Sequence, residues 1–259
     1  MSDFLDKLAV DAKETVKQNY YEVSTQGTLC PVSLKKAITE NKQNAVITEV
    51  KAASPSRGTI RKSFAPKEVA AAMEKGGAAG ISVLTDPKHF SGALSYLTQV
   101  REAVELPILM KDIILDPTQL EAASRIGANV VLLIEALFER QYCEHSLEEM
   151  ITEAHERRLE VLLETHNEDE FRSAVETDAD LVGINNRDLK TLEVDIGITE
   201  RILKKVDSRG KVVVSESGMM APADIIFLRE CGAQAFLIGS AIMVAGNIEK
   251  KVKEFVTAQ

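Results

Sequence analysis

The chain has 259 residues, of which 45% are hydrophobic and 27% are charged. This composition supplies a sizeable core and excludes a disordered or collagen-like chain. Lys and Arg number 31 against 40 Asp and Glu, which leaves a net charge of −9. The chain therefore lacks the overall field expected of a nucleic-acid-binding protein, although a local basic pocket for a small anion remains compatible with it.

The cysteine pattern and the apolar runs indicate the cellular setting. Cys30, Cys143 and Cys231 are far apart and odd in number, which is typical of a reducing compartment. The N-terminus has no signal-peptide core, and no stretch approaches the roughly 18 apolar residues of a membrane span. We expect a cytoplasmic protein without membrane contact. A monomer is expected, although nothing in the sequence decides the oligomeric state.

Helical patterns come first along the chain, over residues 3–18 and again from Ser33. Eight runs rich in Val, Ile and Leu follow, spaced by roughly 22 to 34 residues, which is the length of a strand–helix unit. The runs begin near Ala45, Ala79, Pro107, Asn129, Leu159, Leu181, Lys211 and Ala235.

The segments between the runs predict amphipathic helices with short connections. Residues 66–75, 117–126 and 222–231 each begin with Pro and are followed by Gly, a start and a stop signal together. No linker-like stretch interrupts them. We therefore predict one domain over residues 1–259, with a barrel at 45–259 and an N-terminal helical extension at 1–44.

Buried strands that alternate with helices predict an α/β fold with a parallel sheet. An open doubly wound sheet is the main alternative, but the GxGxxG fingerprint that it often carries is absent. A (β/α)8 TIM barrel is therefore the predicted fold.

Polar residues stand at the ends of the predicted strands, where a barrel builds its active site. They are Glu49, Lys51, Lys111, Glu164, Asn185, Arg187, Glu216 and Ser217. Because alternate strand residues point to opposite faces, the charged residues within the runs share a face with apolar neighbours. The pairs are Glu49 and Lys51 with Ile47, Lys111 with Leu109, Glu164 with Leu162, and Glu216 with Val214. If these neighbours fill the barrel, two ammonium groups and three carboxylates meet at its mouth.

Two interpretations fit this cluster, a catalytic centre or an ion-pair network that closes the barrel. Five charges favour catalysis, because buried ionisable groups are costly and gather where pKa values must be tuned. Turns with glycine follow the last two strands, SESG ending at Gly218 and IGS ending at Ser240. Backbone N–H groups in such turns favour an anion, so we expect a phosphorylated small-molecule substrate.

Motifs in these runs resemble the indole-3-glycerol phosphate synthase family of tryptophan biosynthesis. They are ITEVKAASPSRG (47–58), PILMKDII (107–114), VLLI (131–134), LLET (162–165), GINNRDL (183–189), VSESG (214–218) and FLIGSAIM (236–243). The resemblance implies a carboxy-lyase that closes the ring of 1-(2-carboxyphenylamino)-1-deoxyribulose 5-phosphate, with loss of carbon dioxide and water, to give indole-3-glycerol phosphate. It implies no metal and no organic cofactor.

The resemblance also implies roles within the charged cluster. Lys111 resembles the general acid that protonates the ketone oxygen, and Glu164 the general base of the later dehydration. Lys51 resembles the lysine that holds the anionic groups, and whether it also donates a proton stays open. The residues that orient the lysines and the substrate hydroxyls are then Glu49, Glu216 and Asn185. Burial and a second ammonium would lower the pKa of Lys111, whereas the carboxylates would raise it, and the sequence does not decide between them.

Further residues are implied to bind the substrate. Those for the hydrophilic part, mostly around the phosphate, are Ser54, Arg187, Ser217, Gly218, Gly239 and Ser240. Those of the apolar pocket for the anthranilate ring are Phe90, Leu132 and Leu189, each of which also fits an ordinary core position. The chain has no Trp, so Phe4 or Leu8 is expected to replace an aromatic residue that some relatives supply. The loop at residues 53–62 is expected to close over the substrate.

Two other functions are also compatible with the charged cluster. Another phosphate-binding barrel enzyme, such as an isomerase or an aldolase, would use Lys51 and Lys111 in Schiff-base chemistry. A catalytically silent barrel that binds a phosphorylated metabolite is the second alternative. No metal site is expected from the spacing of His89, His145, His155 and His166. The acidic residues 168–170 are interpreted as a solvated helix start.

Overall fold

The computed structural model describes residues 3–24, 30–54, 58–59 and 64–259. Parallel strands close into an eight-stranded barrel in the order β1-β10-β9-β8-β7-β6-β5-β4. The barrel strands are β1 (Ala45–Val50), β4 (Gly80–Leu84), β5 (Ile108–Lys111), β6 (Val130–Ile134), β7 (Glu160–Thr165), β8 (Leu181–Asn185), β9 (Val212–Glu216) and β10 (Ala235–Ile238). A short antiparallel pair, β2 (Ala53–Ser54) and β3 (Gly58–Thr59), follows β1. The predicted (β/α)8 barrel is confirmed.

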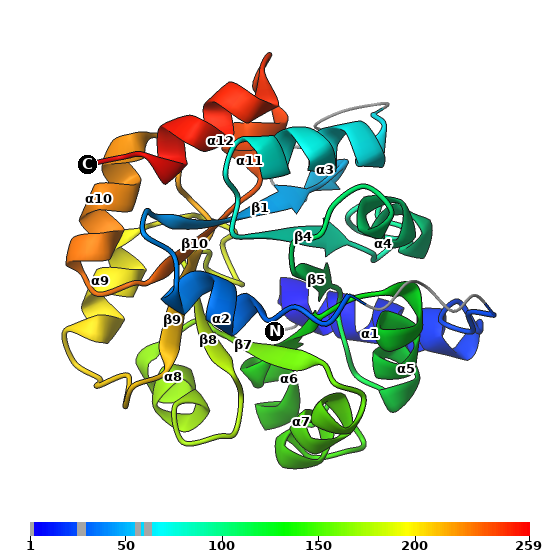
Figure 1. Cartoon of the computed structure of the whole chain (residues 1–259). Coiled ribbons are helices and arrows are strands. Elements are labelled where there is room, and N and C mark those ends of the chain that lie inside the picture. The colour runs from blue at the N-terminus through cyan, green and yellow to red at the C-terminus, as the bar shows by residue number, and fades with distance from the viewer. Residues whose placement is uncertain (1–2, 25–29, 55–57, 60–63) are drawn as a thin grey trace.

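Helices surround the barrel (Figure 1). They are α1 (Phe4–Lys17), α2 (Leu34–Thr39), α3 (Pro66–Lys75), α4 (Leu94–Arg101), α5 (Pro117–Ile126), α6 (Glu135–Glu139), α7 (Leu147–Glu156), α8 (Glu168–Ala174), α9 (Gly197–Leu203), α10 (Pro222–Glu230), α11 (Ser240–Met243) and α12 (Ile248–Val256). The predicted helix start and stop signals are found at α5, where Pro117 lies in the first turn and Gly127 ends the helix with φ 92°. Within the described ranges, no helix is both long and apolar enough to cross a membrane.

The buried apolar residues form two clusters, one on each face of the barrel strands. One cluster fills the barrel interior and includes Ile47, Leu109, Leu162 and Val214, all fully buried. The other cluster lies between the outer face of the strands and the surrounding helices, with Val46 and its outward-facing counterparts. The predicted phase of the strands is therefore confirmed, and the charged residues of the same phase point to the inside of the barrel.

The N-terminal extension contacts both ends of the barrel. Glu160 begins β7 at the amino end, and there its carboxylate accepts hydrogen bonds from the Ser33 hydroxyl and, at 2.8 Å, from the Leu34 N–H of α2. At the carboxyl end, Leu5 and Leu8 of α1 are buried against the barrel interior. The extension therefore contributes to the core and also forms a wall of the carboxyl end.

Candidate active site

A cavity of about 440 Å³ opens at the carboxyl ends of the strands. It lies where the barrel fold places active sites, and its volume suits a small organic ligand. The predicted site residues that line it are Glu49, Lys51, Lys111, Glu164, Asn185, Arg187, Glu216, Ser217, Gly218, Gly239, Ser240, Phe90, Leu132 and Leu189. The side chain of Ser54 and most of the predicted loop at 53–62 lie outside what the structure describes.

Lys111 stands at the centre of the charged cluster. Its Nζ donates hydrogen bonds of 2.9 Å to Oε2 of Glu164 and 2.9 Å to Oε2 of Glu216. Burial alone would lower the pKa of Lys111, but the carboxylates of Glu164, Glu216 and Glu49 outweigh it and raise this pKa above its ordinary value. Lys111 is therefore an ammonium group.

The two carboxylates bound to Lys111 differ in their protonation. Burial disfavours charge on Glu164, but Lys111 and His166 hold its pKa well below the ordinary range. On Glu216, burial and the nearby charge of Glu164 raise the pKa to about 8 despite Lys111. Among the described residues, Oε1 of Glu216 has no hydrogen-bond partner. The pair therefore combines an ionised carboxylate with one that holds a proton more readily.

A second ion pair joins Lys51 to Glu49 at the end of β1. Their side chains are 14% and 5% exposed. Gly239, at the end of β10, makes room for this pair, because a β-carbon there would overlap Oε2 of Glu49 and crowd Nζ of Lys51. Gly239 thus borders the cavity as predicted, and its contact with the ion pair gives a steric reason for glycine at this position.

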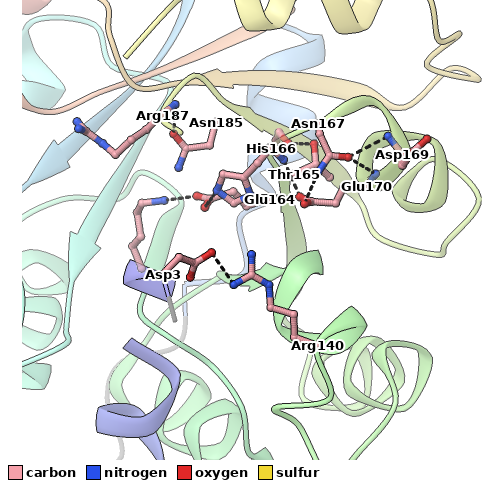
Figure 2. Close-up of polar contacts among 12 residues, drawn as sticks. Asp3, Arg140, Glu164, Thr165, His166, Asn167, Asp169, Glu170, Asn185 and Arg187 are labelled. Atoms are coloured by element: carbon pink, nitrogen blue, oxygen red, sulfur yellow. Dashed lines mark hydrogen bonds and ion pairs between the residues drawn. The ribbon is translucent and has the colours of Figure 1, made fainter. Parts of the chain in front are cut away.

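The end of β8 holds the neighbouring turn in place. The amide of Asn185 lines the cavity, and its Oδ1 accepts a hydrogen bond of 3.1 Å from the Arg187 N–H (Figure 2). Asn186, which the sequence reasoning missed, is fully buried. Its Nδ2 donates to the Ser217 carbonyl at 3.1 Å, where Ser217 has φ 67°. Asn186 therefore supports the strained turn after β9.

Apolar side chains form the remaining wall of the cavity. Phe90, Leu132 and Leu189 line it, as do Phe4 and Leu8 of α1. Phe4 packs edge-on against His89, with 5.9 Å between ring centroids. The extension therefore supplies two of the residues that an aromatic ring in this cavity would contact.

His166 and Glu170 form a polar connection to Glu164 that the sequence reasoning also missed (Figure 2). Nε2 of His166 lies 3.2 Å from Oε1 of Glu164, and Nδ1 lies 3.2 Å from Oε2 of Glu170. Glu170 is buried, so the interpretation of residues 168–170 as a solvated helix start is wrong for this residue. The sequence feature that could have revealed His166 is its position two residues after Glu164, because residues i and i+2 of an extended strand point to the same face.

Over the ranges that the structure describes, no group of three or more His, Cys, Asp or Glu side chains is arranged to hold a metal ion. The site instead combines two lysine ammonium groups, three glutamates and an apolar wall around one cavity. Such a site can hold an anion and move protons to and from an aromatic ligand.

Comparison with protein families gives a match over almost the whole chain. The model of the family described as indole-3-glycerol phosphate synthase matches residues 5–255. The chain belongs to the indole-3-glycerol phosphate synthase family. Its relatives include the indole-3-glycerol phosphate synthases of Polynucleobacter asymbioticus, 41% identical over 95% of this chain and 96% of the relative, and of Methanocaldococcus jannaschii, 39% identical over 99% and 90%. That of Neisseria meningitidis serogroup C is 46% identical over 80% of this chain and 78% of the relative.

Solved structures of other proteins share the fold of this synthase family member. A thiamine phosphate pyrophosphorylase from Pyrococcus furiosus superposes with a TM-score of 0.60 at 14% identity, over 86% of this chain and 96% of its own. An N-acetylmannosamine-6-phosphate 2-epimerase from Clostridium perfringens gives 0.61 at 15% identity, over 82% and 91%. At such identities the likeness shows the barrel fold alone.

Proposed function

We propose that this member of the family closes the indole ring as a carboxy-lyase, with Lys111 as the general acid and Glu164 as the general base. The substrate is 1-(2-carboxyphenylamino)-1-deoxyribulose 5-phosphate, and the products are indole-3-glycerol phosphate, carbon dioxide and water. The observation that carries the assignment is the position of Lys111, whose ammonium bridges Glu164 and Glu216 inside the cavity.

The first step needs an acid at the substrate ketone. As the ring carbon that bears the carboxylate attacks the ketone carbon, the ketone oxygen acquires negative charge. An alkoxide is more basic than an amine, so Lys111 transfers its proton although its carboxylate neighbours raise its pKa. Loss of carbon dioxide then restores the aromatic ring.

The second step needs a base, because dehydration removes a proton as the hydroxyl group leaves. Glu164 can take this role because Lys111 and His166 keep its carboxylate ionised at neutral pH, so that it is able to accept a proton. Glu216 holds Lys111 in place at 2.9 Å and provides a carboxyl group for the substrate hydroxyls. Glu49 orients Lys51 through their ion pair, and Asn185 adds an amide at the same rim.

Binding of the substrate uses both sides of the cavity. The phosphate is held by Arg187 and by the turns after the last two strands, at Ser217, Gly218, Gly239 and Ser240, with Ser54 as a further hydroxyl. Lys51 faces the anionic groups of the substrate. The anthranilate ring lies against Phe90, Leu132 and Leu189. Support for this orientation comes from the cavity itself, in which these two groups of residues, apart from Ser54, line one continuous space.

Schiff-base chemistry is less well supported by the same geometry. A lysine nucleophile must be a neutral amine, which requires a lowered pKa. Glu164, Glu216 and Glu49 shift the pKa of Lys111 in the opposite direction. An acid role for Lys111 therefore fits its surroundings better than a covalent one.

The test is a fluorescence assay of indole formation from the carboxyphenylamino substrate. The chain has no Trp, so protein emission scarcely overlaps the product signal. We expect the signal to grow with the wild type and to fall by at least about a hundredfold with Lys111→Ala, since general-acid catalysis contributes on this order. No signal from a wild type that binds the substrate would contradict the proposal.

A further inference from the structure

We propose that His166 is a positioning residue that keeps Glu164 ionised as the catalytic base, with Glu170 fixing the histidine from its other side. The three side chains form a carboxylate–imidazolium–carboxylate row at the end of β7 and the start of α8 (Figure 2). The proposal rests on the proposed function insofar as it concerns the base, but the charge on His166 can be measured without activity.

The geometry fixes the imidazole between two carboxylates. Nδ1 faces Oε2 of Glu170 at 3.2 Å, and the same oxygen accepts the His166 backbone N–H at 2.7 Å. Asn167 donates from Nδ2 to the other oxygen of Glu170 at 2.5 Å. The ring is thereby held from one side, and its Nε2 comes to lie 3.2 Å from Oε1 of Glu164, an ion-pair contact rather than a hydrogen bond within the described residues.

Burial strengthens this arrangement. The side chains of His166, Glu164 and Glu170 are 7%, 5% and 7% exposed, so solvent screens their charges little. Burial alone would lower the pKa of His166, but Glu164 and Glu170 raise it to about 9. His166 is therefore an imidazolium at neutral pH, and the row carries one positive charge between two negative ones.

Other charged groups lie near the two ends of this row of three side chains. Lys111 from β5 contacts Oε2 of Glu164, whereas His166 contacts Oε1, and Glu216 from β9 contacts Lys111. Beside Glu170, Glu135 from α6 adds negative charge. Lys111 and His166 thus contact different oxygens of the Glu164 carboxylate.

The consequence concerns the moment at which Lys111 gives up its proton. A neutral Lys111 no longer holds Glu164 in its ionised form, and a buried carboxylate without a cation tends to take up a proton. His166 retains its charge through this step and keeps Glu164 as a carboxylate. The base is therefore still available for the dehydration that follows.

The first test measures the charge of His166 by NMR titration of the histidine rings in the full chain. The His166 signal is identified by its absence from His166→Gln. We expect a titration midpoint near 9, and a midpoint at least about 1 pH unit lower in Glu164→Gln and in Glu170→Gln, because each removes an opposite charge from the ring. By thermodynamic linkage, the amount by which Glu164 raises the pKa of His166 equals the amount by which His166 lowers the pKa of Glu164. A midpoint at or below about 6.5, the ordinary value, or one unchanged in Glu164→Gln would overturn the proposal.

The second test is the pH profile of kcat. His166→Gln keeps an amide that can hydrogen-bond but removes the charge, so the acid limb should move up by about 1 pH unit or more, with kcat regained at higher pH. A merely structural role would lower kcat equally at every pH. An acid limb that stays in place would contradict the proposal.

A matched substitution controls for the loss of a histidine. His155, which is 39% exposed and pairs with Asp180 at 2.9 Å on the outside of the barrel, is changed to Gln in parallel. His155→Gln should leave the pH profile unchanged, and a shift of the same size there would overturn the assignment. If the wild type forms no indole, the proposed function fails, whereas the NMR titration still decides the charge of His166.

Discussion

Gly183 on β8 lies directly against the carboxylate of Glu216 on β9. A β-carbon at position 183 would overlap Oε1 of Glu216. Glu216 in turn holds Nζ of Lys111 at 2.9 Å. The position of Lys111 on β5 therefore depends, through Glu216, on the absence of a methyl group at position 183 on β8.

Gly183→Ala should displace the Glu216 carboxylate and with it Lys111. Misplacement of a catalytic group by about 1 Å can cost a hundredfold in rate, so we expect kcat/KM to fall roughly 10- to 100-fold. Steady-state kinetics checks this, together with a thermal melt to show that the barrel is intact. Gly246→Ala is the matched control, because a β-carbon there meets nothing within 4 Å. Equal activities for the two variants would refute the steric argument.

Asp112 predicts a dependence of stability on pH. Its carboxylate is buried and accepts hydrogen bonds from Tyr21 at 3.0 Å and from Thr85 at 2.5 Å. Burial and the charge of Asp86 raise its pKa to about 7 despite these hydrogen bonds. Between an unfolded pKa near 3.8 and this value, the folded protein keeps a proton that the unfolded chain loses. The free energy of unfolding therefore falls as pH rises from about 4 to about 7, by an amount on the order of a few kcal/mol.

Asp112→Asn should remove this dependence, because the amide cannot titrate and its oxygen still accepts from Tyr21. Urea unfolding at pH 5 and pH 8 gives the comparison. We expect the difference in unfolding free energy between the two pH values to shrink in the variant. A difference as large as that of the wild type would show that other groups produce it.

The ion pairs of Arg140 with Asp3 and Asp6 form a tether between α1 and the barrel, and this tether predicts an effect on substrate affinity. Arg140 contacts Asp3 at 2.8 Å (Figure 2) and Asp6 at 2.9 Å, and α1 also carries Phe4 and Leu8 into the cavity. Arg140→Ala should raise KM about 2- to 5-fold at low salt, as expected from loss of partly exposed ion pairs. Salt should reduce the difference from the wild type because it screens the same contacts.

A control for this prediction is Arg125→Ala. Arg125 pairs with Glu121 at 2.6 Å within α5 and is 50% exposed. Its removal takes away a surface ion pair of the same kind at a place that does not hold α1. Unchanged KM in Arg140→Ala, or an equal rise in Arg125→Ala, would show that the tether does not position the helix.

Much of the fold and of the cavity followed from periodicity. Ile47, Glu49 and Lys51 share one face of β1, so the burial of Ile47 inside the barrel placed the two charged residues at its mouth. The direction of the Lys111 pKa shift did not follow, because it depends on distances to carboxylates from three other strands. Glu170 escaped notice for a similar reason, since only the turn after β7 brings it to His166.

Other expectations stay predictions. They are the single domain over residues 1–259, the monomer, the cytoplasmic location, the absence of nucleic-acid binding and of a cofactor, and the closure of the loop at 53–62. The roles of the individual site residues are proposals that the kinetic experiments test.

The division of work between Lys111 and Glu164 is the central claim, and a single-turnover experiment tests it most directly. Carbon dioxide and indole product are followed together in the wild type, Lys111→Met and Glu164→Gln. Lys111→Met should release neither at an appreciable rate, because ring closure precedes decarboxylation. Glu164→Gln should release carbon dioxide while indole formation lags at least about tenfold behind, since only the dehydration lacks its base. Parallel loss of both signals in Glu164→Gln, or carbon dioxide release in Lys111→Met at the wild-type rate, would contradict the account.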